Sequence, residues 1–262
     1  MKVKNLPTID AGYWAAIVAA SMCGANSGDL AAGPLGLGHV NGLLPMAVVF
    51  LVILLAERTS NWTTVAFYWG AIIVLRTMAT NLADLMGHDL RISYPAMQAG
   101  LIALIAVMLL IDKARGAQAT GVMGRDGVWR GLPATDWSYW ITMLAAGTLG
   151  TVIGDWLAER DNLAFGPYVA SLICIPVFLV ALFLATTVGK MTKPWYWVVI
   201  VACRTLGTDL GDASVVFLRG FTPTRSMGLW VSTVLTGCLL AAIVYFWKFK
   251  TVEQLGAEQP AA

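Results

Sequence analysis

The stretch that decides the fold is Thr205-Leu206-Gly207-Thr208-Asp209-Leu210-Gly211-Asp212, which sets two acids in an otherwise apolar run. Related stretches occur earlier in the chain, and each ends on an aspartate 15 residues after the tryptophan of a Tyr-Trp pair. The paired positions are Trp14 and Asp29, Trp69 and Asp84, Trp140 and Asp155, and Trp197 and Asp212. A pattern that recurs four times at one spacing indicates an internal repeat, and repeats of this kind define an architecture.

The composition indicates a membrane protein. Hydrophobic residues make up 58% of the chain and charged residues only 12%, and the mean hydropathy is +0.72. Apolar runs long enough for a spanning helix of ~20 residues recur along the whole length. Lipid offers no hydrogen bonds to the backbone, so only helices or a closed barrel can cross it. The runs lack the alternation of barrel strands, and we therefore expect an all-α membrane protein.

Eight transmembrane helices are expected, arranged as two helices in each of four repeats. The expected spans are 12–32, 43–56, 63–86, 94–111, 137–157, 165–188, 195–216 and 227–247. Residues 1–111 then hold repeats one and two, 112–136 form a cytoplasmic loop, 137–250 hold repeats three and four, and 251–262 form a tail. Because each repeat contains an even number of helices, all repeats have the same orientation and are parallel, within a single membrane domain.

The distribution of basic residues predicts the orientation. Lysine and arginine concentrate on the side that carries both termini, which the positive-inside rule assigns to the cytoplasm. That side holds Lys2, Lys4, Arg58, Lys113, Arg115, Arg125, Arg130, Lys190, Lys193, Lys248 and Lys250, and the other side holds Arg91, Arg160, Arg219 and Arg225. The net charge of +2 reflects this topology and gives no reason to expect nucleic-acid binding.

Alignment on the repeat aspartates predicts a polar stripe on each odd-numbered helix. Three residues earlier lie Asn26, Asn81, Val152 and Asp209; four earlier lie Ala25, Thr80, Thr151 and Thr208; eight earlier lie Ser21, Arg76, Gly147 and Arg204. These offsets share one helical face. Glycine or alanine one and five residues before the aspartate allows another helix to approach closely. If the Tyr-Trp pairs sit in the cytoplasmic aromatic belt, each aspartate lies ~22 Å further along its helix, in the outer third of the membrane.

The free energy of a buried charge predicts where these stripes face. A carboxylate deep in a spanning helix costs at least ~2.5 kcal/mol, so a position facing lipid is excluded. We therefore expect the four odd-numbered helices to face inward and the even-numbered helices to shield them. Arg76 and Arg204 are the expected counter-charges, and the remaining negative charge requires protonation, water or a bound cation.

These residues suggest two functions. In the first, the protein exchanges a divalent cation such as manganese or magnesium for protons, because oxygen ligands suit such ions and no well-placed histidine or cysteine favours zinc or copper. The expected ion- or proton-binding residues are Asp29, Asp84, Asp155, Asp209, Asp212, Asn26, Asn81, Thr151 and Thr208, and the expected metal ligands are Asp29, Asp84, Asp155 and Asp212. In the second, the protein is a non-transporting scaffold or accessory subunit whose polar stripes only hold the helices together.

Other residues carry weaker signals. His39 and His88 follow repeat aspartates and are interpreted as solvated loop residues, with His88-Asp89 as a candidate entrance group beside Asp84. Glu159 is interpreted as part of a solvated loop. The chain shows no nucleotide-binding loop, nucleophile elbow or zinc-protease motif, so we expect no enzymatic activity and no cofactor beyond a divalent cation. The expected partners are the lipid bilayer and a small cation or proton.

The pattern Thr-x-Gly-Thr-x-x-Gly-Asp in tandem two-helix units resembles a bacterial membrane-protein family catalogued as a repeat of unknown function. Repeats three and four fit best, at 148–155 and 205–212. Repeat one departs most, with Met22 and Ala25 in place of threonines, whereas repeat two has Ala79 and Ala83 in place of both glycines. The resemblance implies a bacterial inner-membrane protein with eight spans, and it implies no particular activity.

Overall fold

The computed structural model describes residues 7–60, 65–116, 122–123, 129–130, 135–188 and 191–247. The expected tail at 251–262 lies outside these residues, as does most of the expected loop at 112–136. Several basic residues used to predict the orientation also lie outside them, among them Lys2, Lys4, Arg125, Lys190, Lys248 and Lys250.

The described chain folds into eight α-helices, and each overlaps one of the expected spans. Their bounds are α1 Ala11–Ala32, α2 Gly38–Thr59, α3 Ala66–Asp84, α4 Tyr94–Ala114, α5 Trp137–Ala158, α6 Gly166–Thr187, α7 Lys193–Leu218 and α8 Arg225–Trp247. A π-helical turn, η1 Leu85–Asp89, extends α3, and the short strands β1 Val122–Met123 and β2 Trp129–Arg130 pair antiparallel. Helix α2 is longer than expected because it begins at Gly38 and ends at Thr59, with Pro45 inside it.

Five of the described helices, α2, α4, α5, α6 and α8, are long and apolar enough to cross a membrane. Helices α1, α3 and α7 fall short of that apolarity because they carry the polar repeat residues. Four of the five apolar helices, all except α5, also have few buried positions, as expected of helices whose outer faces meet lipid. The chain is therefore a helical, multi-pass membrane protein.

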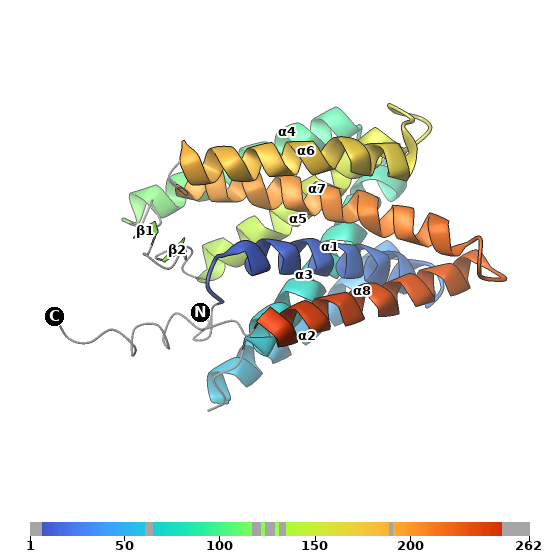
Figure 1. Cartoon of the computed structure of the whole chain (residues 1–262), viewed down its shortest axis with the longest axis horizontal. Coiled ribbons are helices and arrows are strands. Elements are labelled where there is room, and N and C mark those ends of the chain that lie inside the picture. Colours follow the sequence, from blue (N-terminus) through green and yellow to red (C-terminus); the bar gives the residue numbers. More distant parts are fainter. Residues whose placement is uncertain are drawn as a thin grey trace.

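The odd-numbered helices form a closed inner ring, and the even-numbered helices cover it. In the ring α1 contacts α3, α3 contacts α5, α5 contacts α7, and α7 returns to α1. Each even-numbered helix packs chiefly on the odd-numbered helix of the next repeat: α2 on α3, α4 on α5, α6 on α7, and α8 on α1 (Figure 1). The expected inward-facing arrangement is confirmed, and the last repeat closes on the first.

Small residues set the spacing between neighbouring ring helices. Five residues before the aspartate, Gly24 lies against Arg76, and Gly150 lies against Arg204. A Cβ atom on Gly24 would lie 2.5 Å from Cγ of Arg76, and one on Gly150 would lie 2.5 Å from Cβ of Arg204. The other two contacts of this kind join Ala79 to Gly147 and Gly207 to Ser21. Close helix approach beside the polar stripe is thus confirmed, with each small residue facing the next repeat.

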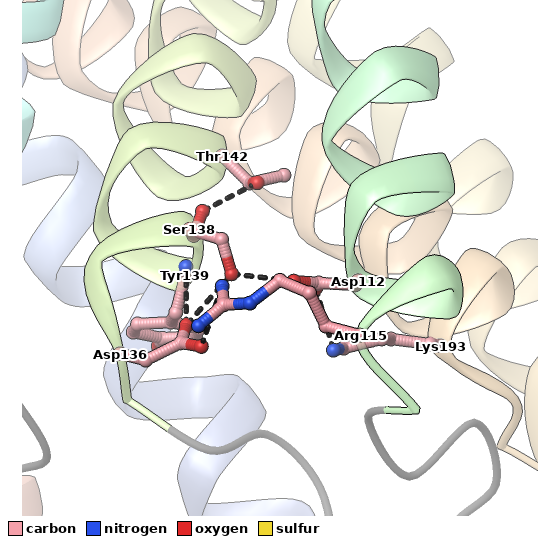
Figure 2. Close-up of polar contacts among 7 residues, drawn as sticks. All are labelled: Asp112, Arg115, Asp136, Ser138, Tyr139, Thr142 and Lys193. Carbon is pink, nitrogen blue, oxygen red and sulfur yellow. Dashed lines mark hydrogen bonds and ion pairs between the residues drawn. The ribbon is translucent and has the colours of Figure 1, made fainter.

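A polar cluster ties together the ends of α4, α5 and α7 (Figure 2). The ammonium of Lys193 lies 2.6 Å from Oδ2 of Asp112, and both side chains are largely buried. The hydroxyl of Ser138 lies 2.5 Å from Oδ1 of Asp112 and 2.7 Å from Oδ1 of Asp136, so it bridges the two carboxylates. Arg115 approaches Oδ2 of Asp136 at 3.5 Å. This network joins repeats two, three and four on the side opposite the repeat aspartates.

Asp136 also caps α5 by accepting a hydrogen bond from the backbone N–H of Tyr139. Burial disfavours its charge, but the hydrogen bonds from Ser138 and Tyr139 and the nearby Arg115 and Lys193 outweigh burial and lower the pKa of Asp136. A carboxylate held ionised in this way stabilises the helix start through the cap and through the helix dipole.

Candidate cation site

The four repeat aspartates line one cavity. Asp29, Asp84, Asp155 and Asp212 come from α1, α3, α5 and α7, and they surround a cavity of about 790 Å³. One helical turn deeper, the cavity is lined by Thr80, Thr151, Thr208 and, in the first repeat, Ala25. The four-fold pattern in the sequence therefore becomes a ring of carboxylates above a ring of three hydroxyls.

Arg76 forms the floor beneath these threonines. Its Nη1 donates to Oγ1 of Thr80 at 2.9 Å and to Oγ1 of Thr151 at 2.7 Å, and its Nη2 donates to Oγ1 of Thr208 at 2.5 Å. The side chain of Arg76 is almost fully buried. One guanidinium thus joins three of the four repeats, and it places a fixed positive charge one helical turn below the carboxylates.

Arg204 occupies the equivalent position on the opposite ring helix and turns away from the cavity. It donates to Oγ of Ser21 at 3.0 Å and contacts Sδ of Met143 at 3.2 Å. Within the described part of the chain, no ion pair joins Arg76 or Arg204 to a carboxylate. Any role of these arginines as counter-charges therefore acts through space and not through direct pairing.

A layer of tyrosines closes the axis on the far side of the arginines. The hydroxyl of Tyr13 lies 2.8 Å from that of Tyr68 and 2.6 Å from that of Tyr196, and the hydroxyl of Tyr68 lies 2.8 Å from that of Tyr139. All four side chains are almost completely buried. Because the hydroxyls satisfy one another, they can lie in the apolar centre of the ring without water.

The tryptophans next to these tyrosines complete the layer by packing on the neighbouring repeat. The ring pairs are Tyr13 with Trp69, Tyr68 with Trp140, Tyr139 with Trp197, and Tyr196 with Trp14, at centroid distances of 5.8, 6.3, 5.6 and 5.9 Å. The interpretation of the Tyr-Trp pairs as an aromatic belt facing the membrane interface is therefore wrong. They lie on the inner helices, which the outer helices separate from lipid.

The residues three positions before the aspartates face the covering helices and do not line the cavity. Asn26 donates to Ser232 of α8 at 2.7 Å, and Asp209 accepts a hydrogen bond from Cys174 of α6 at 3.2 Å. Asn81 lies beside Gly42 of α2, where an added Cβ would be 2.8 Å from its amide nitrogen. Adjacent residues of a helix differ by about 100° in direction, so the positions three and four before the aspartate point to different neighbours. The expected single stripe thus divides in two.

The mouth of the cavity carries charged residues that the sequence reasoning undervalued. His39, His88, Glu159, Arg219 and Arg225 all line it. They come from all four repeats and lie at or near helix ends, so no local sequence pattern links them. The repeat alignment offered one signal, because His88 and Glu159 both lie four residues after a repeat aspartate.

The cavity does not form a preassembled metal centre. Among the described residues, no three His, Cys, Asp or Glu side chains lie close enough together to coordinate one ion. The carboxylates of Asp29, Asp155 and Asp212 have no hydrogen-bond or ion-pair partner within that part of the chain. Such an arrangement can attract a cation that retains its water shell, or take up protons.

The long apolar helices and the repeated architecture define a multi-pass membrane protein built from internal repeats. The chain belongs to the family described as Repeat of Unknown Function (DUF347), whose model matches residues 12–61, 138–190 and 195–252. Searches of curated proteins and of solved structures found no match. The matched ranges correspond to repeats one, three and four, so the model matches repeat one despite Met22 and Ala25 in place of threonines.

Proposed function

We propose that this protein is a bacterial inner-membrane transporter with eight spans and cytoplasmic termini, which exchanges a divalent cation for protons at the four repeat aspartates. The observation that carries the proposal is the shared cavity of about 790 Å³, lined by one equivalent carboxylate from each repeat. A ring of four acids from four helices is expected at an ion pathway, because intramembrane carboxylates are costly and are otherwise rare.

The lack of partners for these acids supports the proposal. Asp29, Asp155 and Asp212 accept no side-chain hydrogen bond from described residues, whereas a purely structural carboxylate would be paired. A bound cation or proton offsets the free energy of holding them together. Their spread around a wide cavity suits an ion such as manganese or magnesium that keeps part of its water shell.

The closed end of the axis supports alternating access. The tyrosine layer and the buried Arg204 separate the carboxylate cavity from the opposite side of the bundle. In this proposal the structure corresponds to a state open on the aspartate side, and release to the other side requires the tyrosine hydroxyls to separate. Asp209, which faces α6, is assigned a packing role.

The test replaces Asp155 and Asp212 with asparagine and measures manganese and magnesium accumulation together with protein level in cells. Both variants are expected to reduce accumulation to that of cells lacking the protein, while the protein level stays normal, because asparagine keeps the shape and removes the charge. Asp209→Asn is the matched control and is expected to transport normally. Normal accumulation by Asp155→Asn and Asp212→Asn at normal protein level would refute transport, and loss of the protein alone favours the scaffold alternative.

A further inference from the structure

A cluster of two imidazoles and two carboxylates lies at one corner of the cavity mouth. Nε2 of His39 lies 3.9 Å from Oδ2 of Asp84, and Nε2 of His88 lies 3.9 Å from Oδ1 of the same carboxylate. Nε2 of His88 also lies 3.6 Å from Oε1 of Glu159. Asp84 is thus flanked by both histidines of the chain, one from repeat one and one from its own repeat.

Hydrogen-bond partners outside the cluster orient His39 and Glu159. Nδ1 of His39 lies 3.1 Å from Oδ2 of Asp89, which directs its Nε2 toward Asp84. The hydroxyl of Tyr94 donates to Oε2 of Glu159 at 2.5 Å, and the other oxygen of Glu159 faces His88. In a metal-binding histidine, the ring nitrogen that does not bind the metal characteristically donates a hydrogen bond to an acceptor such as a carboxylate. Carboxylates that bind the metal are themselves hydrogen-bonded.

We propose that His39, His88, Asp84 and Glu159 form an entrance site for a divalent transition-metal ion. Imidazole nitrogen with carboxylate oxygen suits zinc, cobalt and related ions, whereas magnesium and calcium prefer oxygen alone. This site narrows the ions of the proposed function to divalent transition metals such as manganese and disfavours magnesium. Only its role in ion entry rests on the proposed function. The sequence argument against such ions held that no histidine was well placed, and in the fold both histidines meet at Asp84.

As the structure stands, no three of these four groups lie close enough together to coordinate one ion, so coordination requires them to move. Ligand atoms around a tetrahedral zinc-like ion are roughly 3.4 Å apart, from bond lengths of about 2.0–2.2 Å. The three distances between a histidine Nε2 and a carboxylate oxygen are 3.6–3.9 Å, and the two imidazole centroids are 6.5 Å apart. The ion must therefore draw the groups together. His88 can move, because its side chain is 53% exposed and it lies on the π-helical turn η1, a feature that often marks functional sites.

The repeat alignment places the site at one corner of the mouth. Ten residues after the repeat aspartates lie His39, Tyr94, Phe165 and Thr222, and four residues after them lie Gly33, His88, Glu159 and Val216. Where repeat one meets repeat two, both positions hold a histidine, His39 and His88. Where repeat two meets repeat three, the positions hold Tyr94 and Glu159. The other two junctions supply no imidazole or carboxylate at these positions, so a single ion is expected.

The test titrates the purified full chain in detergent with Co²⁺, using visible absorption to detect nitrogen ligands and calorimetry to measure affinity. The affinity tag must lack histidine, since the chain itself has only two. We expect one Co²⁺ to bind per chain, and we expect excess Mg²⁺ not to displace it. His39→Gln and His88→Gln are each expected to weaken binding at least about tenfold, as is Asp89→Asn, which keeps all four ligands and removes only the orienting carboxylate.

Two controls separate this site from the proposed transport. Asp161→Asn changes an exposed loop acid beside Glu159 and is expected to bind Co²⁺ normally. Asp212→Asn is expected to abolish transport while leaving Co²⁺ binding intact, so either claim can fail alone. The site is refuted if the wild type binds Co²⁺ no more tightly than the double variant His39→Gln/His88→Gln, or if Asp89→Asn and both single variants bind as the wild type does.

Discussion

Gly150→Val is expected to leave little folded protein in the membrane. A Cβ atom at this position would lie 2.5 Å from Cβ of Arg204 and 2.9 Å from both the backbone carbon of Arg204 and the backbone nitrogen of Thr205. Backbone atoms of a neighbouring helix cannot rotate aside, so α5 and α7 would have to separate. Overpacking typically costs about 1–3 kcal/mol and occasionally more, and we expect the upper end here because the clash is with backbone and opens the ring between repeats three and four.

The matched control is Gly100→Val in α4, where nothing lies within 4 Å of an added Cβ. Both substitutions place the same β-branched residue in a helix, so they differ in packing and not in helix propensity. Membrane protein levels and thermal unfolding in detergent should show a large loss for Gly150→Val and a near-normal protein for Gly100→Val. Equal stability of the two variants would contradict the closed ring.

Lys193→Met is expected to reduce the free energy of unfolding by about 3–5 kcal/mol, because it leaves Asp112 buried without its ionic partner. The two side chains are only 11% and 6% exposed, and their charged atoms are 2.6 Å apart. Methionine preserves most of the volume of the lysine stem. The effect therefore reports the uncompensated carboxylate and the loss of the contact between α4 and α7 (Figure 2).

A double-mutant cycle isolates this effect. Combining Lys193→Met with Asp112→Leu removes both charges, and replacing a buried ion pair by apolar residues is often neutral or stabilising. The double variant is therefore expected to be more stable than Lys193→Met alone in chemical unfolding experiments in detergent. If the double variant is less stable than the single one, the ion pair is not the reason for the loss.

The helices and their arrangement in a ring followed from the repeated spacing in the sequence. Apolar length located the helices, and the free energy of a lipid-facing carboxylate required the odd-numbered helices to face inward. The small residues at fixed offsets, such as Gly24 and Gly150, correctly predicted close approach. These features are predictable because they depend on one helix and its immediate neighbour.

The contacts across the ring were not predictable in the same way. The tyrosine hydroxyls satisfy one another only because four repeats meet on one axis, and the sequence alone favoured the common interfacial location of such residues. Asp209 and Asn26 each lie one position after a cavity-lining residue, but they face a covering helix. Which of two adjacent residues faces the cavity depends on the rotation of the helix about its axis, and packing sets that rotation. His39 and Glu159 line the same cavity although they come from repeats one and three, an arrangement that no local pattern encodes.

The most direct test of the account is divalent cation transport by the purified protein in proteoliposomes with an imposed pH gradient. The wild type is expected to move Mn²⁺ or Co²⁺ across the bilayer in the direction opposite to the protons, and Asp212→Asn is expected to move neither. Vesicles with the wild type that behave like empty vesicles, or an Asp212→Asn variant that transports at the wild-type rate, would contradict the claim that the four repeat aspartates form a shared cation pathway.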